Sequence, residues 1–124
     1  MKLANALAQR ADLQRRMAQL ASRLMNNAKV QEGERPAEEP AELLAQLEEI
    51  SRQLEELIRR INLTNTAVRS ETGESLTALL ARRDCLVSTV KVSQMQKQVD
   101  DMSRDLRLLE ETIQSLNWTT ELQE

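Results

Sequence analysis

The sequence predicts an all-α fold, either an antiparallel four-helix bundle or helical hairpins with coiled-coil-like heptad seams. Hydrophobic residues make up 40% of the 124 residues and charged residues 30%, yet Trp118 is the only aromatic residue. The chain holds only two glycines and two prolines. Apolar residues recur in steps of three and four along most of its length, which is typical of amphipathic helices. A sheet protein would need more turn residues and more aromatic or β-branched runs.

The first helix is expected from about residue 2 to residue 26. Leu3, Leu13 and Leu20 belong to its apolar stripe, and the polar face is mostly basic. Two prolines and a glycine interrupt the pattern between residues 27 and 40. Because these residues break helices, we expect a connecting loop there.

The second and fourth helices are expected at about residues 41–61 and 94–116. Both carry an unbroken heptad seam. Ser93, with Gln96 three residues later, fits a capping box at the start of the fourth helix. The predicted packing seam consists of Leu43, Leu47, Ile50, Leu54, Leu57 and Ile61 in the second helix and Met95, Val99, Met102, Leu106, Leu109, Ile113 and Leu116 in the fourth.

The third helix is expected only from about residue 75 to residue 86, because "VSTVKV" follows with a strand-like alternation. At about 1.5 Å per residue this helix is roughly half as long as its neighbours. An antiparallel bundle favours helices of similar length. We therefore expect a segment to be deleted or missing between Leu86 and Val87, within a single domain of residues 1–124.

Composition argues against several classes of function. The net charge of −3 gives no field that attracts nucleic acid. One cysteine and no histidine offer neither a disulfide framework nor a zinc site. Paired carboxylates such as Glu48–Glu49 and Asp100–Asp101 flank the seams and are interpreted as solvated faces. We expect no catalytic residue, no metal and no cofactor.

No stretch approaches the roughly 20 apolar residues of a membrane-spanning helix, and the first residues do not resemble a secretory signal. A cytoplasmic location is therefore expected. The basic first helix has the character of a helix that lies on an anionic membrane. Its apolar stripe is equally what a bundle core requires, and membrane contact is the less favoured interpretation.

One polar cluster is a candidate site. In an up-down bundle the ends of the second and fourth helices meet at the same pole, where amides, hydroxyls and one indole can form a small pocket or simply cap the helices. Capping is the favoured interpretation. The residues of this polar pole are Asn62, Thr64, Asn65, Asn117, Trp118, Thr119 and Thr120.

Four stretches carry a resemblance to a known family: "LANALAQRADLQRRMAQL", "NNAKVQEGERPAEEP", "LIRRINLTNTAVR" and "VSTVKVSQMQKQVDDMSRDLRLLEETIQSLNWTTEL". In this order, over nearly the whole chain, they resemble the septicolysin-like family of small bacterial helical proteins. The resemblance implies a helical protein of unknown function. The family name suggests pore formation, which no residue of this chain supports. Members of the family look longer, with a third helix that continues before "VSTV".

The sequence thus predicts a non-enzymatic interaction or scaffold protein that forms homo-oligomers or binds partner helices. Two alternatives stay open. One is a membrane-active protein, as the family name hints. The other is a small-ligand binder or enzyme that uses the polar pole at Asn62, Asn65, Asn117 and Trp118.

Overall fold

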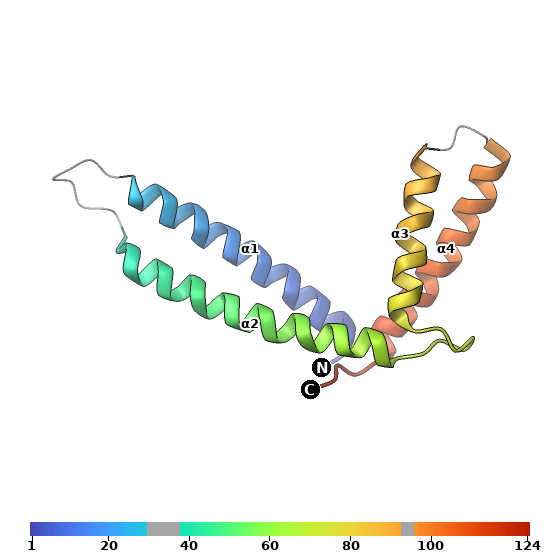
Figure 1. Cartoon of the computed structure of the whole chain (residues 1–124), viewed down its shortest axis with the longest axis horizontal. Coiled ribbons are helices and arrows are strands. Elements are labelled where there is room, and N and C mark those ends of the chain that lie inside the picture. Colours follow the sequence, from blue (N-terminus) through green and yellow to red (C-terminus); the bar gives the residue numbers. More distant parts are fainter. Residues whose placement is uncertain (30–37, 93–95) are drawn as a thin grey trace. The chain divides into compact units, whose positions relative to one another are not determined.

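The computed structural model describes residues 1–29, 38–92 and 96–124, and it confirms the all-α fold. The helices, in chain order, are α1 (Leu3–Ala28), α2 (Pro40–Ala67), α3 (Leu76–Val92) and α4 (Gln96–Thr119). They pack in pairs as two antiparallel hairpins, α1 with α2 and α3 with α4 (Figure 1). Within the described residues the extended backbone is limited to two isolated bridges, Lys2 with Glu121 and Arg69 with Ser75.

The chain divides into two compact units. The first unit is Ala6–Arg59 and contains most of α1 and α2. The second unit joins Met1–Asn5 to Arg60–Glu124, so that it contains both termini, the end of α2, and the α3–α4 hairpin. The division falls inside two helices rather than in a linker.

The core of the first unit is a seam of aliphatic side chains between α1 and α2. Steps of three and four place these residues on the facing sides of the two helices, where they are shielded from water. Leu47, also on the predicted seam, is half-buried. The buried residues of this core are Ala6, Leu13, Leu20, Leu43, Ile50, Leu54 and Leu57.

Polar side chains join the end of α1 to the residues just before α2, at the loop end of the hairpin. Asn27 is only 8% exposed, and its side chain accepts a 2.8 Å hydrogen bond from the Glu38 N–H while it donates one of 2.8 Å to the Arg23 carbonyl. The Glu38 carboxylate also pairs with the Arg23 guanidinium. This pairing lowers the pKa of Glu38. α1 ends at Ala28, so residues 27 and 28, which the sequence assigned to the loop, belong to the end of this helix.

α2 is longer than expected, and its predicted end at residue 61 is wrong. Thr64 lies three residues after Ile61, so it occupies the next seam position, and it is 1% exposed. Its hydroxyl donates a 2.8 Å hydrogen bond to the Arg60 carbonyl, and Thr66 bonds to the Asn62 carbonyl in the same way. These bonds satisfy the hydroxyl groups inside a helix.

α3 is also longer than expected, because it continues through Leu86 and Val87 to Val92. The prediction that "VSTVKV" is strand-like is wrong. Val87 and Val90 are three residues apart and both are half-buried, as on a helix face. Ser88 and Thr89 donate hydrogen bonds to the carbonyls of the residues four positions earlier.

A polar residue at a seam position explains why the sequence pattern did not predict the second half of α3. The seam of α3 repeats at residues 76, 79, 83, 86 and 90 in steps of three and four, but its third position is Arg83 instead of an apolar residue. The predicted capping box at Ser93 and the seam residue Met95 lie outside the described residues. α4 begins at Gln96 and runs to Thr119, three residues beyond its predicted end.

The turn before α3 is compact. Gly73 adopts a positive φ of 85°, a conformation that residues with a Cβ rarely adopt. Its N–H donates to the Ser70 carbonyl at 2.9 Å, and Ser70 N–H donates to the Glu74 carbonyl at 2.8 Å. Ser75 then caps α3, since its hydroxyl accepts a 3.1 Å hydrogen bond from the Ala78 N–H.

The core of the second unit draws on every part of that unit. Leu122, in the C-terminal tail, is as well buried as the helical residues, because the tail is hydrogen-bonded to the first residues of the chain. Two backbone bonds join these ends, from Leu3 N–H to the Thr120 carbonyl (2.8 Å) and from Leu122 N–H to the Met1 carbonyl (2.9 Å). The buried residues of this core are Leu3, Ile61, Thr64, Leu76, Leu79, Leu109, Ile113 and Leu122.

Candidate functional site: a groove on the second unit

An open groove of about 840 Å³ runs along the α3–α4 hairpin, beside the turn that precedes α3. On α3 its lining residues are spaced by three and four, and on α4 the spacing is the same, so each helix presents one continuous face to it. Leucines form the apolar part of this surface: Leu79, Leu86, Leu108, Leu109 and Leu116.

The groove exists because small side chains alternate with the leucines. Beside the apolar seam of α4, the lining has three short hydroxyl-bearing residues, and the turn contributes two more. Short side chains leave space that a leucine would fill. Leu108 lies in the same lining and is 54% exposed. The hydroxyl-bearing residues of the lining are Ser70, Thr72, Thr112, Ser115 and Thr119.

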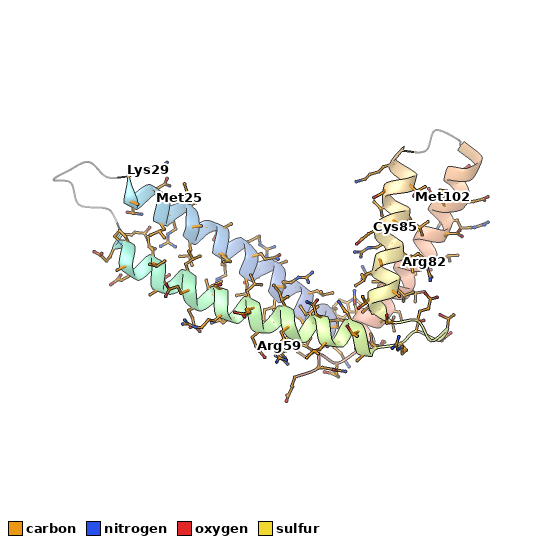
Figure 2. The ribbon with its side chains drawn as sticks, viewed as in Figure 1. Met25, Lys29, Arg59, Arg82, Cys85 and Met102 are labelled. Carbon is orange, nitrogen blue, oxygen red and sulfur yellow. The ribbon has the colours of Figure 1, made fainter. Side chains whose placement is uncertain are left out.

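In the described part of the chain, the charged residues of the groove are three acids and one base: Glu71, Glu74, Asp105 and Arg82. Arg82, labelled on α3 in Figure 2, forms a salt bridge with Glu74. Thr72 reaches the same carboxylate at 3.5 Å. Within the described residues, Glu71 and Asp105 have no such cation partner. The groove therefore combines an apolar floor with two uncompensated negative charges.

Part of the predicted polar pole is used to fasten the C-terminal tail. The Thr64 hydroxyl accepts a 2.9 Å hydrogen bond from the Gln123 N–H, and the Arg60 side chain donates one of 3.0 Å to the Gln123 carbonyl. Thr120 bonds to the backbone of Leu3. These groups tie the C-terminal tail to α2 and to the first residues of the chain.

The other residues of the polar pole lie in mixed surroundings. Asn65 and Asn117 are half-buried, whereas Asn62 and Thr119 are exposed. Trp118 is 59% exposed, so its indole does not form a lid over the core. Of this set, only Thr119 also lines the groove. A pocket built from all seven residues remains a prediction.

Charges reinforce the link between the chain ends. The Glu121 carboxylate lies 2.5 Å from the Lys2 ammonium and 3.2 Å from the N-terminal amine. The hydrogen bond from Lys2, followed by that from the terminal amine, lowers the pKa of Glu121. No local sequence pattern predicts this site, because its groups are separated by nearly the whole chain.

The predicted packing seam lies on the less exposed sides of α2 and α4. On α4, Leu109 and Ile113 are buried, while Met102, Leu106 and Leu116 are half-buried. The side chain of Val99 lies outside the described residues. Leu109 and Leu116 belong to the seam and to the groove at once. The groove is therefore the open side of the seam between α3 and α4.

Reactive and metal-binding groups are scattered over the described surface. Cys85 is an exposed free thiol on α3 (Figure 2). Carboxylates of α2 pair with arginines one turn away, as Glu49 does with Arg52 and Glu56 with Arg59. In the described part of the chain, no three acidic or cysteine side chains gather in a way that could hold a metal ion. No helix in that part is long and apolar enough to cross a membrane.

The fold and the groove together define a class of protein: two α-helical hairpins, one of which carries an open apolar groove with acidic residues at its edge. The chain belongs to a family of unknown function, DUF6847, whose model matches residues 10–88 and 86–122. The two matched segments meet at the position where sequence analysis placed a missing segment.

A solved structure is closely similar. The crystal structure of a functionally unknown conserved protein from Corynebacterium diphtheriae has 36% sequence identity to this chain. The match covers 99% of each chain with a TM-score of 0.91. No curated protein shows significant similarity to the chain.

Proposed function

We propose that the protein is a non-enzymatic helical interaction or scaffold protein that also associates with itself. The observation that carries this proposal is the groove of the second unit. It is open, its floor is leucine, and Leu108 is more than half exposed within it. Surfaces of this kind bind amphipathic helices by burying apolar area.

The chemistry of the side chains favours binding over catalysis. A general acid or base needs a side chain whose pKa is tuned toward neutral pH by burial or by like charges. The resolved pKa shifts of the carboxylates, at Glu38, Glu49 and Glu121, all go downward, away from neutrality. Hydrogen bonds from Arg23, Arg52 and Lys2 are the main causes.

Self-association is the second part of the proposal. A two-helix hairpin has one seam, and its helices bury more apolar surface when they pair with another helix pair. In the first unit, Leu44 is 45% exposed and Met25 is 59% exposed. We expect a second copy to cover such side chains.

Sedimentation velocity over a range of concentrations tests self-association. We expect species heavier than the 14.2 kDa chain, and Leu44→Glu should shift them toward the monomer. Gln46→Glu, an exposed position two residues away, adds the same charge and should leave the distribution unchanged. A monomer at every concentration overturns self-association and leaves the interaction function of the groove standing.

The resemblance to septicolysin-like proteins suggests membrane activity as the other candidate, but α1 argues against it. Its stripe is shielded at Leu3, Ala6, Leu13 and Leu20, so binding to lipid would require α1 to leave its partners. Dye release from anionic liposomes tests this candidate, and we expect no release above that caused by buffer.

We propose a cytoplasmic location, which suits the free thiol of Cys85.

A further inference from the structure

We infer that the groove of the second unit binds a basic amphipathic helix of a partner protein. This inference rests on the proposed interaction function and adds the chemistry of the partner. It combines three observations: the leucine floor, the uncompensated acids, and the length of the groove.

The leucine floor of the groove is complementary to an apolar stripe on the partner helix. Leu108 is 54% exposed, and Leu86 and Leu116 are half-buried at the surface of the same groove. A helix that lays leucines at positions i, i+3, i+4 and i+7 over these side chains removes them from water. Thr112 and Ser115 have short side chains, which leave room for the leucines of the partner helix.

The negative charge of the groove favours a basic partner. The carboxylate of Glu74 already pairs with Arg82, but Glu71 and Asp105 lack a cation within the described residues. Lysines or arginines at the edges of the bound helix would neutralise both acids. Next to an apolar surface, where water is displaced, such pairs are stronger than in open solvent.

The same charges disfavour a second copy of this groove as the occupant. Two grooves placed face to face would bring together Glu71 and Asp105 from both copies, which repel each other. Among the described lining residues only Arg82 carries a positive charge, and it is already paired with Glu74. The exposed side chains proposed for self-association, Met25 and Leu44, are not among the lining residues of this groove.

The length of the groove defines the length of the partner segment. On α4 it extends from Asp105 to Thr119, about 21 Å at 1.5 Å per residue. A bound helix of about four turns, or roughly 14 residues, spans this distance.

Three matched peptides test the inference by isothermal titration calorimetry against the full chain. Each is a capped helical peptide of about 14 residues with the same leucine stripe, and the polar positions are all lysine, all glutamine or all glutamate. We expect the lysine peptide to bind best, the glutamine peptide more weakly and the glutamate peptide weakest. The advantage of the lysine peptide should shrink as salt is added.

Variants of the protein locate the binding. Leu108→Asn should weaken binding of the lysine peptide about tenfold, since one leucine contact is lost. Leu63→Asn removes a similarly exposed leucine of α2, outside the groove lining, and is the matched control. Glu71→Gln combined with Asp105→Asn should cost the lysine peptide up to about tenfold and leave the glutamine peptide unchanged. Glu111→Gln is an exposed acid of α4 outside the groove and controls for charge.

The outcomes separate the inference from the proposed function. Equal binding of the lysine and glutamine peptides, lost in Leu108→Asn, would overturn the basic partner and keep the interaction function of the groove. Failure of all three peptides would overturn both. A chain that is dimeric by sedimentation and becomes monomeric in Leu108→Asn would show that a second copy occupies the groove, against the inference.

Discussion

Along α2, the residues that face α1 are large and aliphatic from Leu43 to Leu57, whereas the side of α4 that lines the groove alternates leucine with serine and threonine. Both patterns repeat in steps of three and four. In the first unit the repeat yields a seam of buried side chains, and in the second unit it yields a seam with an open side. The difference shows that periodicity determines which face turns inward, while side-chain volume determines whether that face closes.

The two units also differ in how they are fastened. The first is closed at its loop end by Asn27 and Glu38, which are 11 residues apart. The second is closed by Glu121 and Gln123, which bond to groups up to 120 residues away in sequence. The second unit therefore depends on a tail that can pack only after the whole chain is made.

Truncation of one seam residue in each unit should give the largest effect. Ile50→Ala leaves a closed cavity and should cost about 2–5 kcal/mol of unfolding free energy. Leu109→Ala lies beside the groove, where no closed cavity forms, and should cost about 1.5–3 kcal/mol. Urea unfolding, with hydrogen exchange of α2 and α4 amides, measures each loss. A larger loss for Leu109→Ala would contradict the contrast between the units, and Gln114→Ala on exposed α4 surface is the control.

Gly73→Ala should destabilise the second unit by about 1 kcal/mol, because the turn holds Gly73 at positive φ. Apart from Gly73 and its two chain neighbours, no residue has an atom within 4 Å of the added Cβ, so the cost comes from the backbone conformation. Gly73→Asn should recover part of the loss, since asparagine tolerates this conformation. Hydrogen exchange should speed up in α3 and not in α1. Equal losses in Ala and Asn variants would point to another cause.

Lowering the pH should weaken both units, each through its own carboxylate. The folded-state pKa values of Glu38 and Glu121 lie below the ordinary value of 4.5. Stability is therefore present above pH 4.5 and is lost as the pH falls through the lower folded values. Thermal unfolding from pH 7 to pH 3 at low salt measures this. Glu38→Gln should reduce the pH dependence of stability for the amides of α1 and α2 only. Glu121→Gln should reduce it for the amides of the second unit only.

The smallest expected effect concerns the position between Leu86 and Val87. α3 passes through it without a break, and the solved relative is matched over 99% of its chain. We expect peptide mapping of the purified protein to show Leu86 joined directly to Val87, with no added mass between them. A heavier mass, with extra peptides mapped between these residues, would show a missing segment in the second unit.

The regular helices could be predicted from sequence because their signal is local. Heptads in α2 and α4 need only the order of residues such as Leu54, Leu57 and Ile61. The ends of α2 and α3 could not be predicted in the same way. Thr64 is buried because the C-terminal tail covers it, and Arg83 takes a seam position without ending the helix.

Only part of the candidate site was visible in the sequence. Leu109 and Leu116 were predicted as seam residues, and they also line the groove. Glu71, Arg82 and Asp105 were not singled out, because their meaning depends on a turn and two helices that meet in space. A repeat of leucine with serine and threonine on one helical face was the available signal.

The sequence by itself determined that the protein is helical, which faces of α2 and α4 turn inward, and that no aromatic core forms. These properties follow from the side chains of residues three and four positions apart. The tertiary structure decided that α3 continues past Leu86, that the chain ends join through Glu121, and that the α3–α4 seam stays open as a groove. Those properties arise from contacts between distant residues and from the volume that their side chains fill.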